Sequence, residues 1–380
     1  MAETTDLASL LAERGPWTTA YIDGPSDLPE PDELARRRAV RDAVKATGAP
    51  AADVLAIEGA LNTATGFRSP STRYVLVREG RIEVDESFAG PRGGPEQFAH
   101  GPVPLLLALL RHRREDLAYL VVETAREGAS VRVERAGVDE PERVEEVEGD
   151  TDSLPKVSAG GWSQARYQRH SEEVWSGNQA DVAETVDRVA RQEEPRFVVV
   201  SGDTRARQML LEKLDRSVRD LVIEVDAHTR ADGASEAAVD EAVADALDHE
   251  LRDEEGDALD RASAQGHRLG AQGVREITPL LQRAQVDTLV LADDMVDSER
   301  LLDALGEAPW VAEGDDDEYS VRSLGRVPAG DALARAAILT GARVVVTTER
   351  LEPGEPRPER PPREPIAVLR WPEDAVQPAD

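Results

Sequence analysis

The feature that most constrains the fold is a regular alternation of helical and strand patterns in the C-terminal part of the chain. The helical segments carry apolar side chains at helical spacing, and they are 274–284, 298–305 and 331–340. The strand segments are short runs rich in valine and leucine, and they are 286–291, 343–347 and 366–370. Such alternation predicts a largely parallel sheet covered by helices, which is an α/β/α sandwich.

The preceding part of the chain predicts an N-terminal unit of α+β class. A helical segment over 32–46 is followed by a hairpin, in which Glu79-Gly80 joins two β-rich runs, and by a short apolar helix over 103–110. The basic run over 111–114 then marks a domain boundary.

A central unit of mixed α/β class follows this boundary. A second hairpin turns at Glu127-Gly128, and a long helix over 164–192 follows a stretch too polar to be core. Strands are expected at 197–200 and 221–225, with Asp203 or Thr204 capping the helix between them. Because the chain exceeds the size of one core, we expect three domains, and they are 1–113, 114–232 and 233–380.

The charge of the chain limits the partners that it can take. Asp and Glu number 76 against 45 Lys and Arg, so the formal net charge is −31, and only three of the basic residues are lysines. A genome rich in G and C explains this composition, and so does a high-salt cytoplasm, where a Debye length of about 3 Å screens the self-repulsion. The charge argues against general nucleic-acid binding, so any RNA contact has to be local and no DNA partner is expected.

Other classes are excluded by what the sequence lacks. Without cysteine the chain has no disulfide, thiol nucleophile or cysteine-ligated zinc. No apolar run reaches membrane-spanning length and the first residues lack the layout of a signal peptide, so we expect a cytoplasmic protein with no membrane partner. No phosphate loop, dinucleotide fingerprint or zinc-protease motif occurs, so we expect no cofactor and no metal. The carboxylate pair Asp293-Asp294 is interpreted as a helix start after a strand.

One window, residues 153–171, differs from the rest of the chain because it contains no acid, although the stretch before it is strongly acidic. A Gly-Gly pair lets the backbone approach a partner closely, arginines and a helix N-terminus suit phosphate oxygens, and tryptophan stacks on bases. The window is therefore interpreted as a projecting RNA-binding loop, with candidate residues Lys156, Gly160, Gly161, Trp162, Ser163, Arg166, Arg169 and His170. The alternative is a surface loop whose tryptophan packs against the preceding hairpin.

Residues 160–169 resemble the central loop of the archaeo-eukaryotic class-1 peptide-chain release factors. In that family a Gly-Gly-Gln is followed by Ser and, three residues later, by Arg, an aromatic residue, one further residue and Arg. The positions that match are Gly160, Gly161, Ser163, Arg166, Tyr167 and Arg169. The order of hairpin, loop, long helix, strand, helix and strand also agrees, so the resemblance covers about residues 117–370. It implies a prokaryotic member of this superfamily, with a C-terminal domain similar to a ribosomal-protein fold.

The resemblance departs from the family at the catalytic glutamine, whose place is taken by Trp162. In the family that glutamine helps to place the water that attacks the peptidyl-tRNA ester, and such work depends on position. Gln164 lies two residues later, and related peptidyl-tRNA hydrolases of ribosome quality control also carry a glutamine in a rearranged loop. Gln164 is therefore the candidate catalytic residue. Residues 1–113 lack the Asn-Ile-Lys-Ser motif, so we expect no reading of stop codons.

Three hypotheses of function follow from the resemblance. The first is a ribosome-associated factor that occupies the A site near the peptidyl-transferase centre of idle or stalled ribosomes, as Pelota-like rescue factors and Balon-type hibernation factors do. Its candidate partners are ribosomal RNA, tRNA and an elongation-factor GTPase. The second is a peptidyl-tRNA hydrolase that uses Gln164, and the third is a stress-linked regulatory protein that has lost the ribosome. The replacement of glutamine by Trp162 favours the first.

Overall fold

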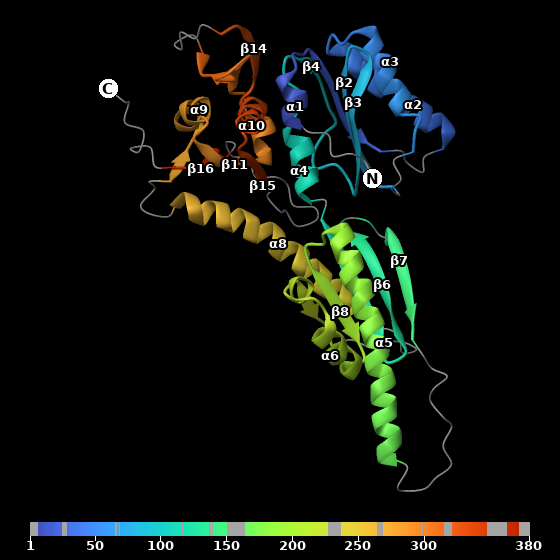
Figure 1. Ribbon diagram of the computed structural model, residues 1–380. Helices are drawn as coiled ribbons and strands as arrows, with labels where there is room; N and C mark the ends of the chain where they lie inside the picture. Colours follow the sequence, from blue (N-terminus) through green and yellow to red (C-terminus); the bar gives the residue numbers. More distant parts are fainter. Residues whose placement is uncertain are drawn as a thin grey trace. The chain divides into compact units, whose positions relative to one another are not determined.

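The computed structural model describes most of the chain, in the ranges 7–24, 29–64, 67, 69–115, 117–136, 138, 140–149, 164–226, 237–263, 269–297, 299–314, 321–347 and 363–371 (Figure 1). The chain divides into two compact units. One unit joins the two ends of the chain, residues 1–115 and 253–380, and the other contains residues 116–252. The predicted α/β class with several sheets is confirmed. Within the described ranges, no helix has the length and apolar character needed to cross a bilayer.

The N-terminal segment folds as an antiparallel sheet with helices on both faces. Its strands, in the order β3-β2-β1-β4, are β1 (Trp17–Asp23), β2 (Ser71–Arg78), β3 (Arg81–Ala89) and β4 (Gln97–Gly101). The predicted hairpin is the pair β2 and β3. The helices are α1 (Leu7–Ala12), α2 (Glu30–Ala46), α3 (Ala51–Ala60) and α4 (Leu107–Glu115). Helix α4 begins later than predicted, where Asp331 accepts hydrogen bonds from the backbone N–H groups of Leu106 and Leu107.

The C-terminal segment has a mixed sheet, so the prediction of a largely parallel one is wrong. Its strands, in the order β10-β16-β11-β15, are β10 (Gly270–Gln272), β11 (Val286–Ala292), β15 (Arg343–Thr347) and β16 (Ile366–Leu369). Strands β11 and β15 are parallel, but β16 returns antiparallel to β11 and β10 pairs antiparallel to β16. Helices α9 (Val274–Gln282) and α10 (Ala329–Leu339) complete this segment.

The helix predicted over 298–305 is also wrong. Residues Leu301–Leu305 form strand β12, which pairs antiparallel with β13 (Val311–Ala312) and β14 (Ser323–Pro328) in a small second sheet. Leu302 and Ala304 are buried while Leu301 and Asp303 are not, which is the two-residue period of a strand. A pattern of five residues is too short to distinguish this period from a helical one. Pairing with the neighbouring strands therefore determines that the segment is a strand.

One hydrophobic core joins the N-terminal and C-terminal segments. Tyr74 of β2 and Leu109 of α4 belong to the same cluster of buried side chains as Leu289 of β11 and Leu333 of α10. All four side chains are fully buried. This shared core explains why residues 1–115 and 253–380 form a single compact unit.

The central unit is a five-stranded mixed sheet in the order β7-β6-β5-β8-β9. Its strands are β5 (Ala118–Ala125), β6 (Gly128–Arg135), β7 (Arg143–Glu148), β8 (Val198–Gly202) and β9 (Val222–Glu224). Its helices are α5 (Gln164–Glu193), α6 (Thr204–Lys213), α7 (Arg216–Arg219) and α8, which begins here and spans Ala237–Ser263. Strand β7 lies in the stretch predicted to be outside the core, and its exposure alternates along the strand, as at an edge.

The two faces of the central sheet carry separate cores. On one face the valines of β5, β6 and β8 pack against α5 and α6, including Val182, Val186 and Val189 of α5. On the other face Val121 and Val199 pack with residues of α8. The C-terminal half of α5 is therefore fixed on the sheet by its apolar face.

Candidate functional site

The structure describes only some of the residues of the predicted site. The five predicted residues that precede α5 lie outside the described residues, and they are Lys156, Gly160, Gly161, Trp162 and Ser163. The other predicted residues occupy the first two turns of α5, and they are Gln164, Arg166, Arg169 and His170. The helical backbone of these turns is described, and their side chains lie outside what the structure describes. Gln164 is the first residue of the helix.

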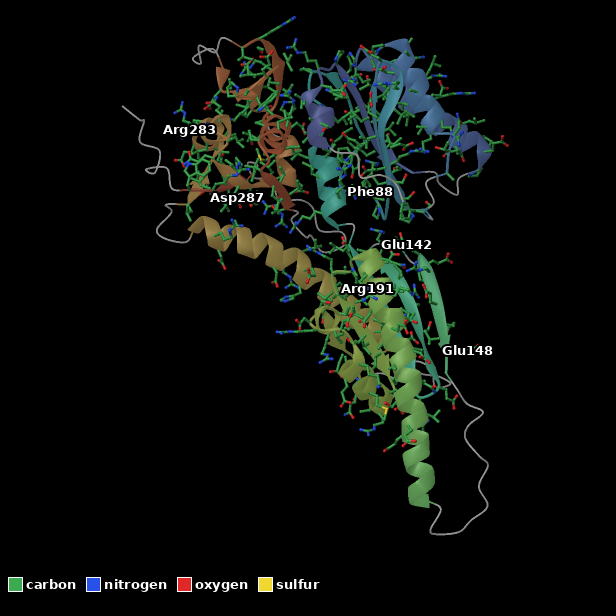
Figure 2. All side chains as sticks on the ribbon, in the orientation of Figure 1. Phe88, Glu142, Glu148, Arg191, Arg283 and Asp287 are labelled. Atoms are coloured by element: carbon green, nitrogen blue, oxygen red, sulfur yellow. The ribbon has the colours of Figure 1, made fainter. Side chains whose placement is uncertain are left out.

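The topology determines which edge of the central sheet carries this window. Strands β5, β8 and β9 are parallel, and β7 runs in the same direction because two antiparallel steps separate it from β5. Gly149, directly after β7, therefore lies at the carboxyl edge of these strands, where its N–H donates to the Glu127 carbonyl oxygen at 2.7 Å. Glu148 lies at this edge, while Glu142 and Arg191 lie at the other end of the unit (Figure 2). Carboxyl edges are where α/β sheets most often place their functional sites.

The N-terminal part of α5 extends beyond this edge. In Figure 1 the helix continues past the end of the sheet, and we call residues 164–177 the α5 arm. None of residues 172–177 is fully buried, and burial begins with Asn178 and Gln179. Residues 164–171, the last part of the predicted window, thus form the outer end of this arm.

Two amide side chains attach α5 to the end of β5. Gln179 is completely buried, and its Nε2 donates to the Ala125 carbonyl oxygen at 2.8 Å while its Oε1 accepts from the Thr124 hydroxyl at 2.8 Å. The Nδ2 of Asn178 donates to the Arg126 carbonyl oxygen at 3.1 Å. Because a buried amide without partners is costly, these bonds specify how the helix sits on the strand.

An arginine and a tryptophan make the next contact toward the arm. The guanidinium carbon of Arg126 lies 4.6 Å from the ring centre of Trp175, and the same guanidinium pairs with Asp203 at 3.1 Å. Asp203 is the N-cap of α6, as predicted, and its carboxylate accepts from the backbone N–H groups of Arg205 and Ala206. Burial alone would raise the pKa of Asp203, but the N–H of Ala206 and the charge of Arg126 hold it below its usual value. Asp203 therefore stays ionised and keeps Arg126 in place.

We call Arg126, Trp175, Asn178 and Gln179 the α5 clamp. Sequence reasoning missed all four residues, because they are polar or lie off the apolar face of α5. Two glycines allow the close contact around them. A side chain at Gly202, where φ is +113°, would place its Cβ 1.9 Å from the Thr124 carbonyl oxygen, and one at Gly149 would meet Asn178 at 2.3 Å.

The carboxylate pair after β11 has a structural role. Asp293 and Asp294 begin a 3₁₀ helix (Asp293–Asp297), as interpreted from the sequence, and Asp294 accepts a hydrogen bond from the backbone N–H of Arg363 at 3.2 Å. Across the part of the chain that the structure describes, no three metal-ligating side chains gather in one place.

Comparison with known proteins assigns the segment that carries the arm and the clamp. The model of the bacterial archaeo-eukaryotic release factor family 2 matches residues 118–268. Residues 118–268 are thus similar to the archaeo-eukaryotic release factors of bacteria. The match includes the whole of α5, the window at 153–171 and the four clamp residues. The resemblance inferred from residues 160–169 is thus confirmed at the level of the superfamily.

Individual proteins similar to this chain include the uncharacterized protein Rv2629 of Mycobacterium tuberculosis. It is 25% identical over 356 residues, which cover 90% of this chain and 92% of the relative. Pelota of Archaeoglobus fulgidus is 16% identical over 80% of each chain, with a TM-score of 0.32. Dom34 of S. cerevisiae is 9% identical over 81% of this chain and 80% of its own, with a TM-score of 0.40.

Proposed function

We propose that this protein is a ribosome-associated translation factor, which places residues 153–171 near the peptidyl-transferase centre of idle or stalled ribosomes and acts in hibernation or rescue. The observation that carries the proposal is the family match over residues 118–268, because the matched segment contains this window. The α5 arm, whose outer end carries residues 164–171 of the window, supports it, since a narrow, projecting helix can enter a cavity that a whole domain cannot.

The distribution of charge is compatible with a local RNA contact. The chain as a whole carries −31, yet the window has basic side chains and no acid. Arg166, Arg169 and the N–H groups at the start of α5 would bind phosphate oxygens, and Trp162 would stack on a base. A contact of this kind keeps the acidic surface away from ribosomal RNA.

The first experiment is co-sedimentation of the full chain with ribosomes of its own host, at the salt concentration of that host. The double variant Arg166→Ala/Arg169→Ala is expected to weaken binding by about tenfold or more and to lower its salt dependence, because two phosphate contacts are lost. A matched control is Arg188→Ala/Arg191→Ala, which removes the same charge at the opposite end of α5. Equal binding by the two double variants would contradict the RNA contact at the window.

A second function, peptidyl-tRNA hydrolysis, is favoured by one observation. Gln164 is the first residue of α5, directly after the Gly-Gly-Trp-Ser sequence, so it sits where the helix N–H groups favour negative charge. If Gln164 orients the attacking water, Gln164→Ala should lower peptide release by roughly a hundredfold or more and leave ribosome binding unchanged. Binding without release by the unaltered chain supports hibernation or rescue instead. No binding at all would overturn both functions and leave a regulatory protein without the ribosome.

A further inference from the structure

We propose that the α5 clamp holds the arm across a weak point in the helix at Gly177, and that it thereby sets the direction in which the arm presents residues 153–171. The effect of the clamp on ribosome binding rests on the proposed function. The positions of the clamp residues carry it: Trp175 lies on the arm side of Gly177, whereas Asn178 and Gln179 lie on the side that packs on the sheet.

The weak point follows from the local sequence. Glycine in a helix interior is less favourable than alanine by about 1 kcal/mol, and helices bend preferentially at Gly/Ser pairs such as Ser176-Gly177. Gly177 is exposed, and no neighbouring atom lies within 4 Å of the place that a Cβ would take. Close packing therefore does not require glycine here, and nothing beside this residue stiffens the helix.

The helix on the inner side of Gly177 is firmly held. Val182, Val186 and Val189 are fully buried against the sheet, and both polar atoms of Gln179 are hydrogen-bonded. Beyond Gly177, among the side chains that the structure describes, Trp175 contacts Arg126, and Glu172 pairs with Arg205 at 3.8 Å with both side chains about half exposed. An ion pair of that kind contributes little.

Arg126 is therefore the link that connects the two sides. Its backbone carbonyl oxygen accepts from Asn178, and its guanidinium lies over Trp175. Its pairing with Asp203 also fixes this side chain to the N-terminus of α6. The arm is thus braced against the sheet and against α6 at once. Trp175 and Arg126 are positioning residues in this proposal, because they act through the direction of the arm.

The direction of the arm can be measured by pulsed electron paramagnetic resonance. The chain has no cysteine, so spin labels at Gln168→Cys on the arm and Ser217→Cys on α7 give a single intramolecular distance. We expect a narrow distance distribution in the otherwise unaltered chain and a clearly broader one after Trp175→Ala. Trp175→Phe keeps a ring under Arg126 and should stay narrow. Trp175→Ala/Gly177→Ala should also return toward the narrow distribution, because alanine stiffens the helix.

Ribosome binding by the unlabelled proteins completes the test. Trp175→Ala is expected to weaken binding by roughly two- to fivefold, the equivalent of one cation–π contact, and Gly177→Ala in the same chain should restore it. The matched control is Trp310→Ala in the other unit, which removes a ring that also lies beneath an arginine, Arg335, at 5.5 Å, and which should alter neither measurement.

The two proposals fail in different ways. An unchanged distance distribution in Trp175→Ala, or no recovery on adding Gly177→Ala, would overturn the clamp whatever the ribosome does. Failure of the unaltered chain to bind ribosomes would overturn the proposed function, and the distance distributions would still decide whether the clamp directs the arm.

Discussion

At the scale of single residues, Asp331 is the clearest case of a carboxylate that the fold buries although burying a charge costs free energy. It is fully buried at the start of α10, and its Oδ1 accepts from the N–H groups of Leu106 and Leu107 at 2.7 and 3.3 Å. Burial raises its pKa from 3.8 to about 6, against the opposite effect of these two bonds. The carboxylate thus ties the N-terminal segment to the C-terminal one and determines where α4 begins.

We expect Asp331→Asn to remove a pH dependence of stability. Because the folded pKa lies above the unfolded value, this group supplies stability that is present below pH 3.8 and is lost as the pH rises through 6. Asparagine keeps the accepting oxygen without the charge. At pH 8 the variant should therefore be more stable than the unaltered chain, by up to roughly 3 kcal/mol, and this advantage should vanish near pH 4.

Denaturant unfolding at the two pH values measures this difference. His112 titrates in the opposite sense, because burial and Arg111 lower its pKa to about 3, so its stability contribution is lost as the pH falls below 6.5. That loss is shared by both proteins and cancels in the comparison. A stability difference that stays constant from pH 4 to pH 8 would contradict the role given to the Asp331 charge.

The basic run over 111–114 shows what residue-level patterns miss. The run was expected to mark a boundary, and the first unit's N-terminal segment does end nearby, at residue 115. Yet Arg111 and His112 are buried, and both bond to the Tyr21 hydroxyl, at 2.6 and 2.9 Å. Their partner lies 90 residues away in β1, so no local pattern reveals it.

At the scale of elements, Gly202 controls how β8 meets β5. Its φ of +113° lies in a region that favours glycine, and an added Cβ would stand 1.9 Å from the Thr124 carbonyl oxygen. We expect Gly202→Ala to lower the free energy of unfolding of the central unit by at least about 2 kcal/mol, through strain and a backbone collision. The opposite end of the β5–β8 pairing, where both strands begin, should be destabilised less.

Hydrogen exchange in the intact chain tests this expectation. The backbone amide of Asp203, which donates to Thr124 at the carboxyl end of the pairing, should lose protection before those of Leu120 and Val198. Gly177→Ala serves as the matched control, because the space at that glycine is open and its helical backbone suits alanine. Equal effects of the two substitutions would show that the close approach at Gly202 is unimportant.

The elements divide into those that the sequence determines locally and those that it does not. Helix α5 and the hairpin of β5 and β6 follow their predicted ranges closely, because each has a strong period or a turn signal of its own. Strand β7 is short and charged, and β12 is a short apolar run, so neither has a clear local signal. Pairing with neighbouring strands determines the conformation of both. The antiparallel return of β16 is likewise set by the sheet rather than by its own residues.

The candidate site shows the same division. The window at 153–171 is predicted from the sequence because its composition changes abruptly there. The clamp was not found, because Arg126 lies in the turn after β5 while its partners Trp175 and Asn178 lie far along the chain on α5, and each of them is an ordinary polar or surface residue in the sequence. What the sequence could not reveal is therefore the set of contacts that hold α5, whereas the site at 153–171 stays a prediction.

At the scale of the whole molecule, the two ends of the chain fold as one unit although 137 residues separate them. We expect two cooperative thermal transitions instead of the three that three independent domains would give. Leu109→Ala in the N-terminal segment and Leu333→Ala in the C-terminal segment should lower the same transition, each by roughly 5 to 15 °C, because both side chains belong to one core.

Differential scanning calorimetry of the full chain distinguishes the two arrangements. Val186→Ala, in the core of the central unit, is the control that should lower only the other transition. If Leu109→Ala and Leu333→Ala lowered different transitions, the two segments would unfold separately and the shared core would not hold them together. If they lower one transition, no deletion can remove residues 1–115 without exposing the apolar side chains of the C-terminal segment, and the N-terminal segment is then a structural part of that unit.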